Sequence, residues 1–86
     1  MTRDDRTYIL RLLDAQRASL ANRVAAARHR IEDDERHAAS AFGLSWSAEG
    51  KRVFAAHLDT ERAHLVSLEA ELARCDEVIA AVEAMP

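Results

Sequence analysis

The sequence predicts an all-α protein: a single domain over residues 1–86 that folds as one long antiparallel two-helix hairpin, a coiled coil. Three observations predict this fold. Residues that break helices are scarce, because the 86 residues include only two glycines and one proline, which is the last residue. Apolar residues recur at heptad spacing in two long runs, which is the pattern of a coiled coil. The two runs also carry charges of opposite sign.

The first helix is expected over about residues 3–42. Thr2 can accept hydrogen bonds from the first-turn amides, and Asp4 and Asp5 suit the positive end of the helix dipole. No proline or glycine interrupts the chain before Gly43. We expect Gly43 to take the left-handed conformation that commonly ends a helix, with Leu44 folding back onto the last turn.

The second helix is expected over about residues 47–84, after a turn at about 43–46. Ser45 or Ser47 can cap its first turn, where Glu49 also falls. Each helix would be close to 60 Å long at about 1.5 Å per residue. Helices of this length are typical of coiled coils rather than of ordinary globular domains.

The heptad spacing also predicts how the two helices pair. The rows of core positions are Leu10, Leu13, Arg17, Leu20, Val24, Ala27, Ile31, Asp34 and Ala38 in the first helix, and Phe54, Leu58, Glu61, Leu65, Leu68, Leu72, Cys75, Ile79 and Val82 in the second. Folding the chain at about Trp46 places Leu20 opposite Leu72 and Val24 opposite Leu68. The two rows then meet along their whole length in one antiparallel register.

The charges support the same register. Residues 1–30 hold seven arginines and three aspartates, whereas residues 53–86 hold two arginines and seven acidic residues. Side chains that flank the rows can therefore form pairs between the helices. The predicted pairs are Arg23 with Glu71, Arg28 with Glu69, and Glu35 with Arg62. Such pairs help to fix register even where they add little stability.

Apolar side chains outside the rows predict a partner. Two helices bury only one narrow stripe each, and 18 of the apolar residues are alanines, which add little core volume. We expect the hairpin to dimerise into a four-helix bundle, or to pack against a helical partner. The predicted partner-binding residues are Tyr8, Leu12, Val66 and Val78, with Phe42, Leu44 and Trp46 at the turn. The turn residues can instead plug the end of the bundle, and an exposed Trp is a common binding hot spot.

Ionisable residues gather near the bend in the predicted register. They are Asp34, His37, His57, Glu61 and His64. One interpretation is a polar layer that fixes register; a second is a solvated gap where the helices splay for a partner. A third is an iron or zinc site, because Glu-x-x-His is the spacing of two ligands one turn apart in di-iron bundles.

The third interpretation also rests on a resemblance. Through Glu61, His64 and one acidic residue of the first helix, the layout is similar to that of the encapsulated ferritins. These are short two-helix chains that build an iron site across a dimer. The resemblance implies a metal-binding, ferritin-like dimer. The dense carboxylates and aromatic residues of such a site are missing from this sequence.

The sequence favours an interaction protein over an enzyme. No nucleophile pattern and no Gly-rich phosphate loop occur, so we expect no catalysis, no cofactor and no small-molecule substrate. The leading hypothesis is an adaptor, small chaperone or assembly factor, and the size and outline are similar to those of the hairpin co-chaperones of bacterial secretion systems. A small helical RNA- or DNA-binding dimer is a further alternative, opposed by the dispersed arginines.

The sequence also predicts where in the cell the protein is located. One cysteine, no 18-residue apolar run and a charged N-terminus favour a soluble, cytoplasmic protein that does not enter a membrane.

Overall fold

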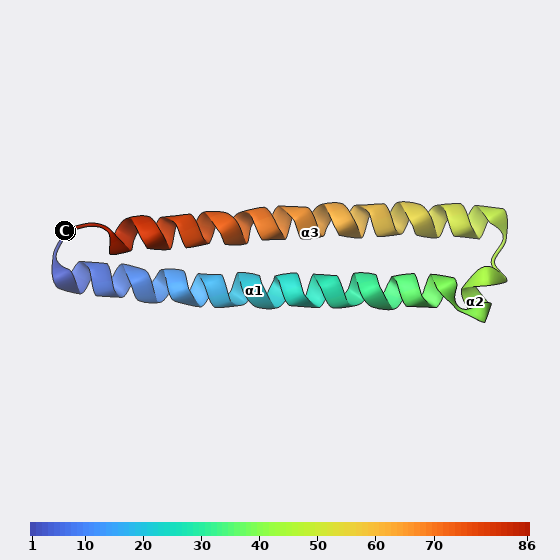
Figure 1. The fold of residues 1–86 in the computed structure, drawn as a ribbon, viewed down its shortest axis with the longest axis horizontal. Helices are drawn as coiled ribbons and strands as arrows, with labels where there is room; N and C mark the ends of the chain where they lie inside the picture. Colours follow the sequence, from blue (N-terminus) through green and yellow to red (C-terminus); the bar gives the residue numbers. More distant parts are fainter.

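The chain forms two long antiparallel helices joined by a short helical bend. The computed structural model describes all residues 1–86, with α1 at Arg3–Ala39, α2 at Ala41–Leu44 and α3 at Ala48–Glu83 (Figure 1). No strand is present, and α1 packs along α3. The molecule measures 62 × 15 × 13 Å. The predicted all-α, extended hairpin is confirmed, whereas its dimerisation stays a prediction.

Side chains cap both long helices at their N-termini. The Thr2 hydroxyl accepts a hydrogen bond from the backbone N–H of Asp5 at 3.1 Å. The Ser47 hydroxyl accepts one from the N–H of Gly50, also at 3.1 Å. Each bond satisfies a first-turn donor that has no partner within its helix. Of the two serines that could cap the second helix, Ser47 is therefore the one that does so.

The bend differs from the one that the sequence predicted. The first helix ends at Ala39 rather than at about residue 42, because Ser40 is extended, with φ −72° and ψ 166°. The Ser40 hydroxyl donates to the carbonyl of His37 at 2.6 Å and accepts from the N–H of Gly43 at 3.3 Å. One serine thus closes α1 and starts α2, as serine hydroxyls do when they compete with helical hydrogen bonding.

Gly43 has a different role from the one expected. Its φ is not positive, so the prediction of a left-handed residue is wrong. The residue is instead buried against the end of α1. A Cβ atom at this position would lie 2.5 Å from the carbonyl oxygen of His37 and 2.7 Å from the carbonyl carbon of Ala38. The bend needs glycine here because the backbone of α2 approaches that of α1 so closely.

The core lies along the predicted heptad rows. All eight buried apolar residues belong to these rows, and they are Leu20, Val24, Ala27, Ile31, Leu58, Leu68, Cys75 and Val82. Arg17 is the only row position that is exposed. The central cluster contains residues from both helices, and Leu65, Leu72 and Ile79 pack against it. The predicted register therefore places the right side chains in the core.

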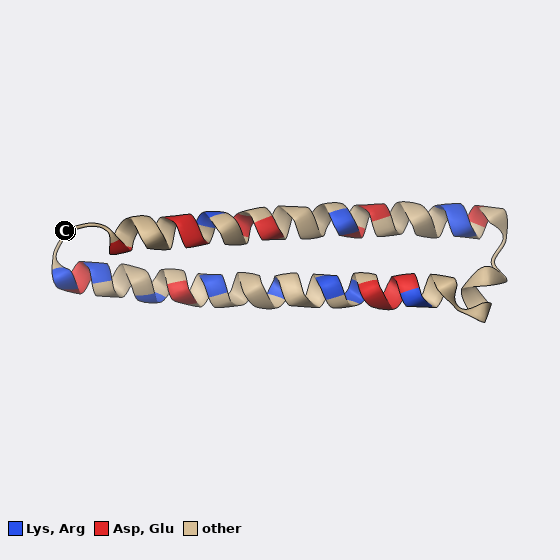
Figure 2. Cartoon of the chain, viewed as in Figure 1, with Lys and Arg blue, Asp and Glu red and all other residues tan.

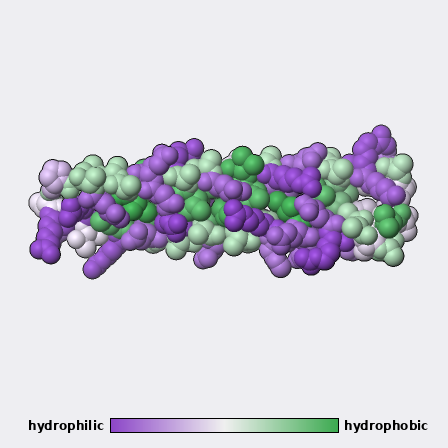
Figure 3. Space-filling view, in the orientation of Figure 1, coloured by the Kyte–Doolittle hydropathy of each residue, from purple (hydrophilic) through white to green (hydrophobic).

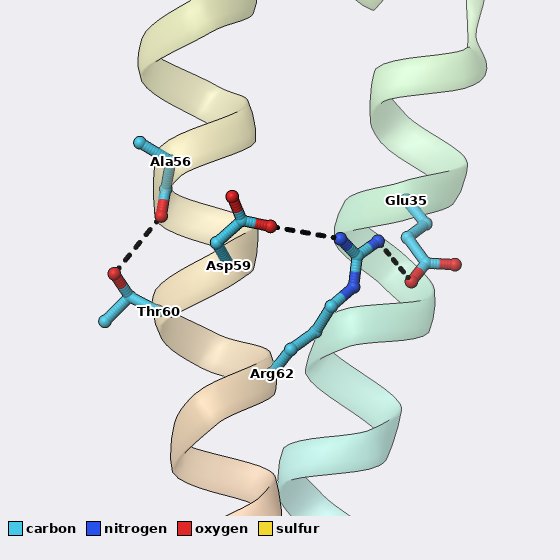
Figure 4. Close-up of polar contacts among 5 residues, drawn as sticks. All are labelled: Glu35, Ala56, Asp59, Thr60 and Arg62. Carbon is cyan, nitrogen blue, oxygen red and sulfur yellow. Dashed lines mark hydrogen bonds and ion pairs between the residues drawn. The ribbon is translucent and has the colours of Figure 1, made fainter.

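Charged residues of both signs lie along both long helices (Figure 2), and some of them form ion pairs between the helices. Arg28 Nη2 lies 3.5 Å from Glu69 Oε2, as predicted. Arg62 joins Glu35 at 3.1 Å and Asp59 at 3.5 Å, so that it links α3 to α1 (Figure 4). The third predicted pair, Arg23 with Glu71, does not form, because neither side chain has an oppositely charged group within 4.0 Å.

Arg17 forms an ion pair that the sequence did not predict. Its Nε donates to Asp76 Oδ1 at 2.5 Å. The hydrogen bond to Asp76, together with the charge of that carboxylate, raises the pKa of Arg17 above its usual range. Because the pKa of Arg17 is raised, the contribution of this pair to folding stability is lost only when the pH rises through that pKa. Stability near neutral pH therefore does not depend on the titration of Arg17.

Candidate functional site

Three ionisable side chains meet between the helices near the bend. Asp34 comes from α1, and His57 and Glu61 come from α3. The two α3 residues are four positions apart, so that they lie one above the other on the same face of the helix. His57 Nε2 lies 3.6 Å from Asp34 Oδ2 and forms a close ion pair with Glu61 Oε1. One potential metal-ligand atom from each residue lies within 4.8 Å of the other two. We call these residues the Asp34–His57–Glu61 cluster.

The cluster is buried on one side and open on the other. The side chain of Glu61 is 19% exposed and that of His57 is 55% exposed. Glu61 Oε2 is buried and has no hydrogen-bond partner. No arginine or lysine forms an ion pair with Asp34 or Glu61. Glu61 Oε2 is the one buried side-chain nitrogen or oxygen of the hairpin without a hydrogen-bond partner, and a buried carboxylate oxygen without a donor is unfavourable.

Only part of the predicted group of five ionisable residues comes together. His64 is exposed and forms no ion pair, although Glu61-x-x-His64 was the spacing that suggested a metal site. Glu61 instead pairs with His57, one turn earlier in α3. His37 packs against Phe42 with ring centroids 5.3 Å apart. Helical spacing alone could not choose between the two histidines, because both are neighbours of Glu61 on α3.

Aromatic rings connect the cluster to the bend. Trp46 packs against Phe42 and Phe54, with ring centroids 6.0 Å and 4.8 Å apart, and its ring lies 5.8 Å from that of His37. Phe54 in turn lies 5.9 Å from the ring of His57. Trp46 is half-buried, and its role as a plug or as a binding residue stays a prediction. Phe42 and Leu44 remain exposed at the end of the hairpin.

The other predicted partner-binding residues are exposed. The exposed fractions are 64% for Tyr8, 55% for Leu12, 67% for Val66 and 48% for Val78. Figure 3 shows apolar side chains between polar ones along one face of the molecule. We call Tyr8, Leu12 and Val78, near the two chain ends, the open-end face.

A groove lies beside the open-end face. Its volume is about 380 Å³, and it is lined by Leu13, Gln16, Leu20, Glu71, Arg74, Cys75 and Val78. Val78 thus lines the groove directly, and Leu12 lies one helical turn before Gln16. The groove is open to solvent and does not enclose a cavity. Small ligands are usually held in closed pockets rather than in open grooves of this kind.

Comparisons with known proteins add no functional assignment. No protein family, curated protein or solved structure matches this chain. The resemblances to encapsulated ferritins and to secretion co-chaperones are therefore unsupported by these comparisons. None of the helices has an apolar stretch that could cross a membrane.

Proposed function

We propose that this chain is a non-enzymatic interaction module that packs its open-end face against a second copy, forming a four-helix bundle. The bundle would serve as a cytoplasmic adaptor, small chaperone or assembly factor that binds other helical proteins by the same kind of packing. The chain has a single cysteine, Cys75, and the absence of a disulfide framework is typical of proteins from a reducing compartment.

The small size of the core carries this proposal. Only nine of 86 residues are buried, and the accessible surface is 6211 Å². A compact protein of 9.6 kDa would expose about 5,100 Å². The excess is about 1,100 Å², which is comparable to the roughly 800 Å² that each partner buries in an ordinary interface. A second copy could cover this excess.

The open-end face is the favoured surface because both helices contribute to it. Arg6 Nη1 donates to the carbonyl of Met85 at 2.6 Å, so that the first turns of α1 lie beside the end of α3. Leu12 and Val78 project from these two segments. A partner helix laid along the groove would contact both helices at once, which is the arrangement of a four-helix bundle.

Nucleic-acid binding is less well supported. Arg17 and Arg28 of α1 are paired with Asp76 and Glu69 of α3. Their charges are therefore partly neutralised within the hairpin, and phosphate binding depends on free positive charge.

The interface is tested by charge substitutions. In a symmetric dimer, Leu12→Glu or Val78→Glu places the charge in the interface twice. Each of the two copies loses the burial of one apolar side chain, which is worth about 1.5 kcal/mol or more. The dissociation constant of the dimer should therefore rise by about 100-fold or more. Sedimentation velocity measures the association, and circular dichroism checks that the hairpin stays helical.

Val53→Glu is the matched control. Val53 is 61% exposed and lies near the bend rather than at the open end. This variant should associate as the unmodified chain does. Equal weakening by all three substitutions, or no weakening by Leu12→Glu and Val78→Glu, would contradict the proposed interface.

A further inference from the structure

We propose that the Asp34–His57–Glu61 cluster binds one divalent transition-metal ion, of which Zn²⁺ is the ion to test. The proposed site lies within one hairpin and does not depend on the proposed dimer. It uses one imidazole nitrogen and carboxylate oxygens from both long helices. This goes beyond the interaction function, because it assigns a ligand to the polar break in the core.

The geometry is close to that of a metal site. Zinc–nitrogen and zinc–oxygen bonds of about 2.0–2.2 Å in a tetrahedron place the ligand atoms about 3.3–3.6 Å from each other. His57 Nε2 and Asp34 Oδ2 are already 3.6 Å apart. The candidate ligand atoms of the cluster all lie within 4.8 Å of one another. His57 Nε2 lies closer to Glu61 Oε1 than the ligand atoms of such a tetrahedron lie to each other, so the proposed site requires these two side chains to move apart around the ion.

The negative charges of the cluster also favour the binding of a cation. Two carboxylates share one histidine, and neither pairs with an arginine or lysine. Glu61 Oε2 is buried without a hydrogen-bond partner. A bound ion would compensate both negative charges and give Glu61 a positively charged partner on its buried side. Buried carboxylates are usually paired in this way or bound to metal.

The exposure of His57 gives an ion access to the cluster. Its side chain is 55% exposed, so water can reach this side and fill the remaining coordination position. Nε2 must be free of its proton to bind the ion. An imidazolium would release that proton to water, and a neutral ring would carry its proton on Nδ1. The mixed nitrogen and oxygen ligands favour Zn²⁺ over Mg²⁺, which prefers oxygen ligands.

A second histidine–carboxylate pair serves as an internal comparison. His29 Nε2 lies 3.3 Å from Asp33 Oδ2 on the outer face of α1, with 73% of the histidine side chain exposed. It has the same spacing as His57 and Glu61, but it is not part of a three-ligand group. If the four-residue spacing of a histidine and a carboxylate were enough to bind zinc, His29 and His57 would contribute equally to zinc binding.

Calorimetric titration of the full chain with zinc chloride tests the site. One ion should bind per chain. His57→Ala and Asp34→Asn should each weaken binding by at least about tenfold, since even the loss of supporting groups around metal ligands has effects of about 10–100-fold. His64→Ala and His29→Ala should leave the affinity unchanged. Circular dichroism of each variant without metal checks that the helices are retained.

Two further measurements separate this site from the proposed dimer. Zinc should alter the fluorescence of Trp46, the single tryptophan, whose ring packs on Phe54 beside His57. Leu12→Glu should bind zinc with the affinity of the unmodified chain. No binding at millimolar zinc, unchanged binding in His57→Ala, equal loss in His64→Ala, or binding only by dimers would each overturn the proposal.

Discussion

At the scale of single residues, the heptad pattern predicted Glu61 as a polar break in the core, and the structure places it between the helices near Asp34. The pattern could not show that His57 rather than His64 would be its partner. Which histidine contacts Glu61 depends on how each imidazole ring is oriented relative to the opposite helix. Gly43 shows the same limit, because the need for glycine comes from the backbone of α1, which local sequence does not report.

Gly43→Ala should destabilise the hairpin. The added Cβ would meet the carbonyl groups of His37 and Ala38, and backbone atoms cannot move aside as a flexible side chain can. We expect a loss of about 1–3 kcal/mol, which is typical of overpacking. Urea unfolding followed by circular dichroism measures the change.

Gly50→Ala is the control for this substitution. A Cβ at Gly50 would lie 3.4 Å from Ser47 Oγ and 3.6 Å from Trp46 Cβ, which are ordinary contacts. Alanine in a helix should stabilise the chain by about 0.5–1 kcal/mol. A neutral or stabilising effect of Gly43→Ala would show that the close approach is not needed for the bend.

At the scale of elements, the caps of both long helices were predictable because a hydroxyl before a run without breakers is a local signal. The end of α1 was not predictable in the same way. Ser40 sits in a sequence that could have continued the helix, and its hydroxyl competes for the bonds of His37 and Gly43. Where α1 ends therefore depends on whether the chain can reverse direction here so that α3 packs along α1.

Ser47→Ala tests the cap of α3. The substitution removes the acceptor for the N–H of Gly50 and should lower stability by about 1 kcal/mol. Ser67→Ala, at an exposed position inside α3, removes no cap and should be neutral or slightly stabilising. Thermal unfolding of the two variants compares them directly. A larger loss for Ser67→Ala would mean that the Ser47 bond does not hold the start of α3.

At the scale of the whole molecule, apolar spacing and charge sign together predicted the antiparallel register. Their agreement is informative because each depends on a different set of side chains. The radius of gyration is 19.2 Å, whereas a compact domain of this length has a value of about 12 Å. The hairpin therefore has a large surface relative to its core. This supports the proposed packing against a partner, whose identity the sequence does not give.

The dependence of stability on protein concentration tests the central claim most directly. If a second copy completes the core, association stabilises the folded state by mass action. Raising the concentration about 100-fold should then move the urea midpoint upward, by about 1 M for a dimer of this size. Sedimentation of the same samples should give twice the 9.6 kDa mass of the chain. An unchanged midpoint, together with a monomer mass at every concentration, would contradict the claim.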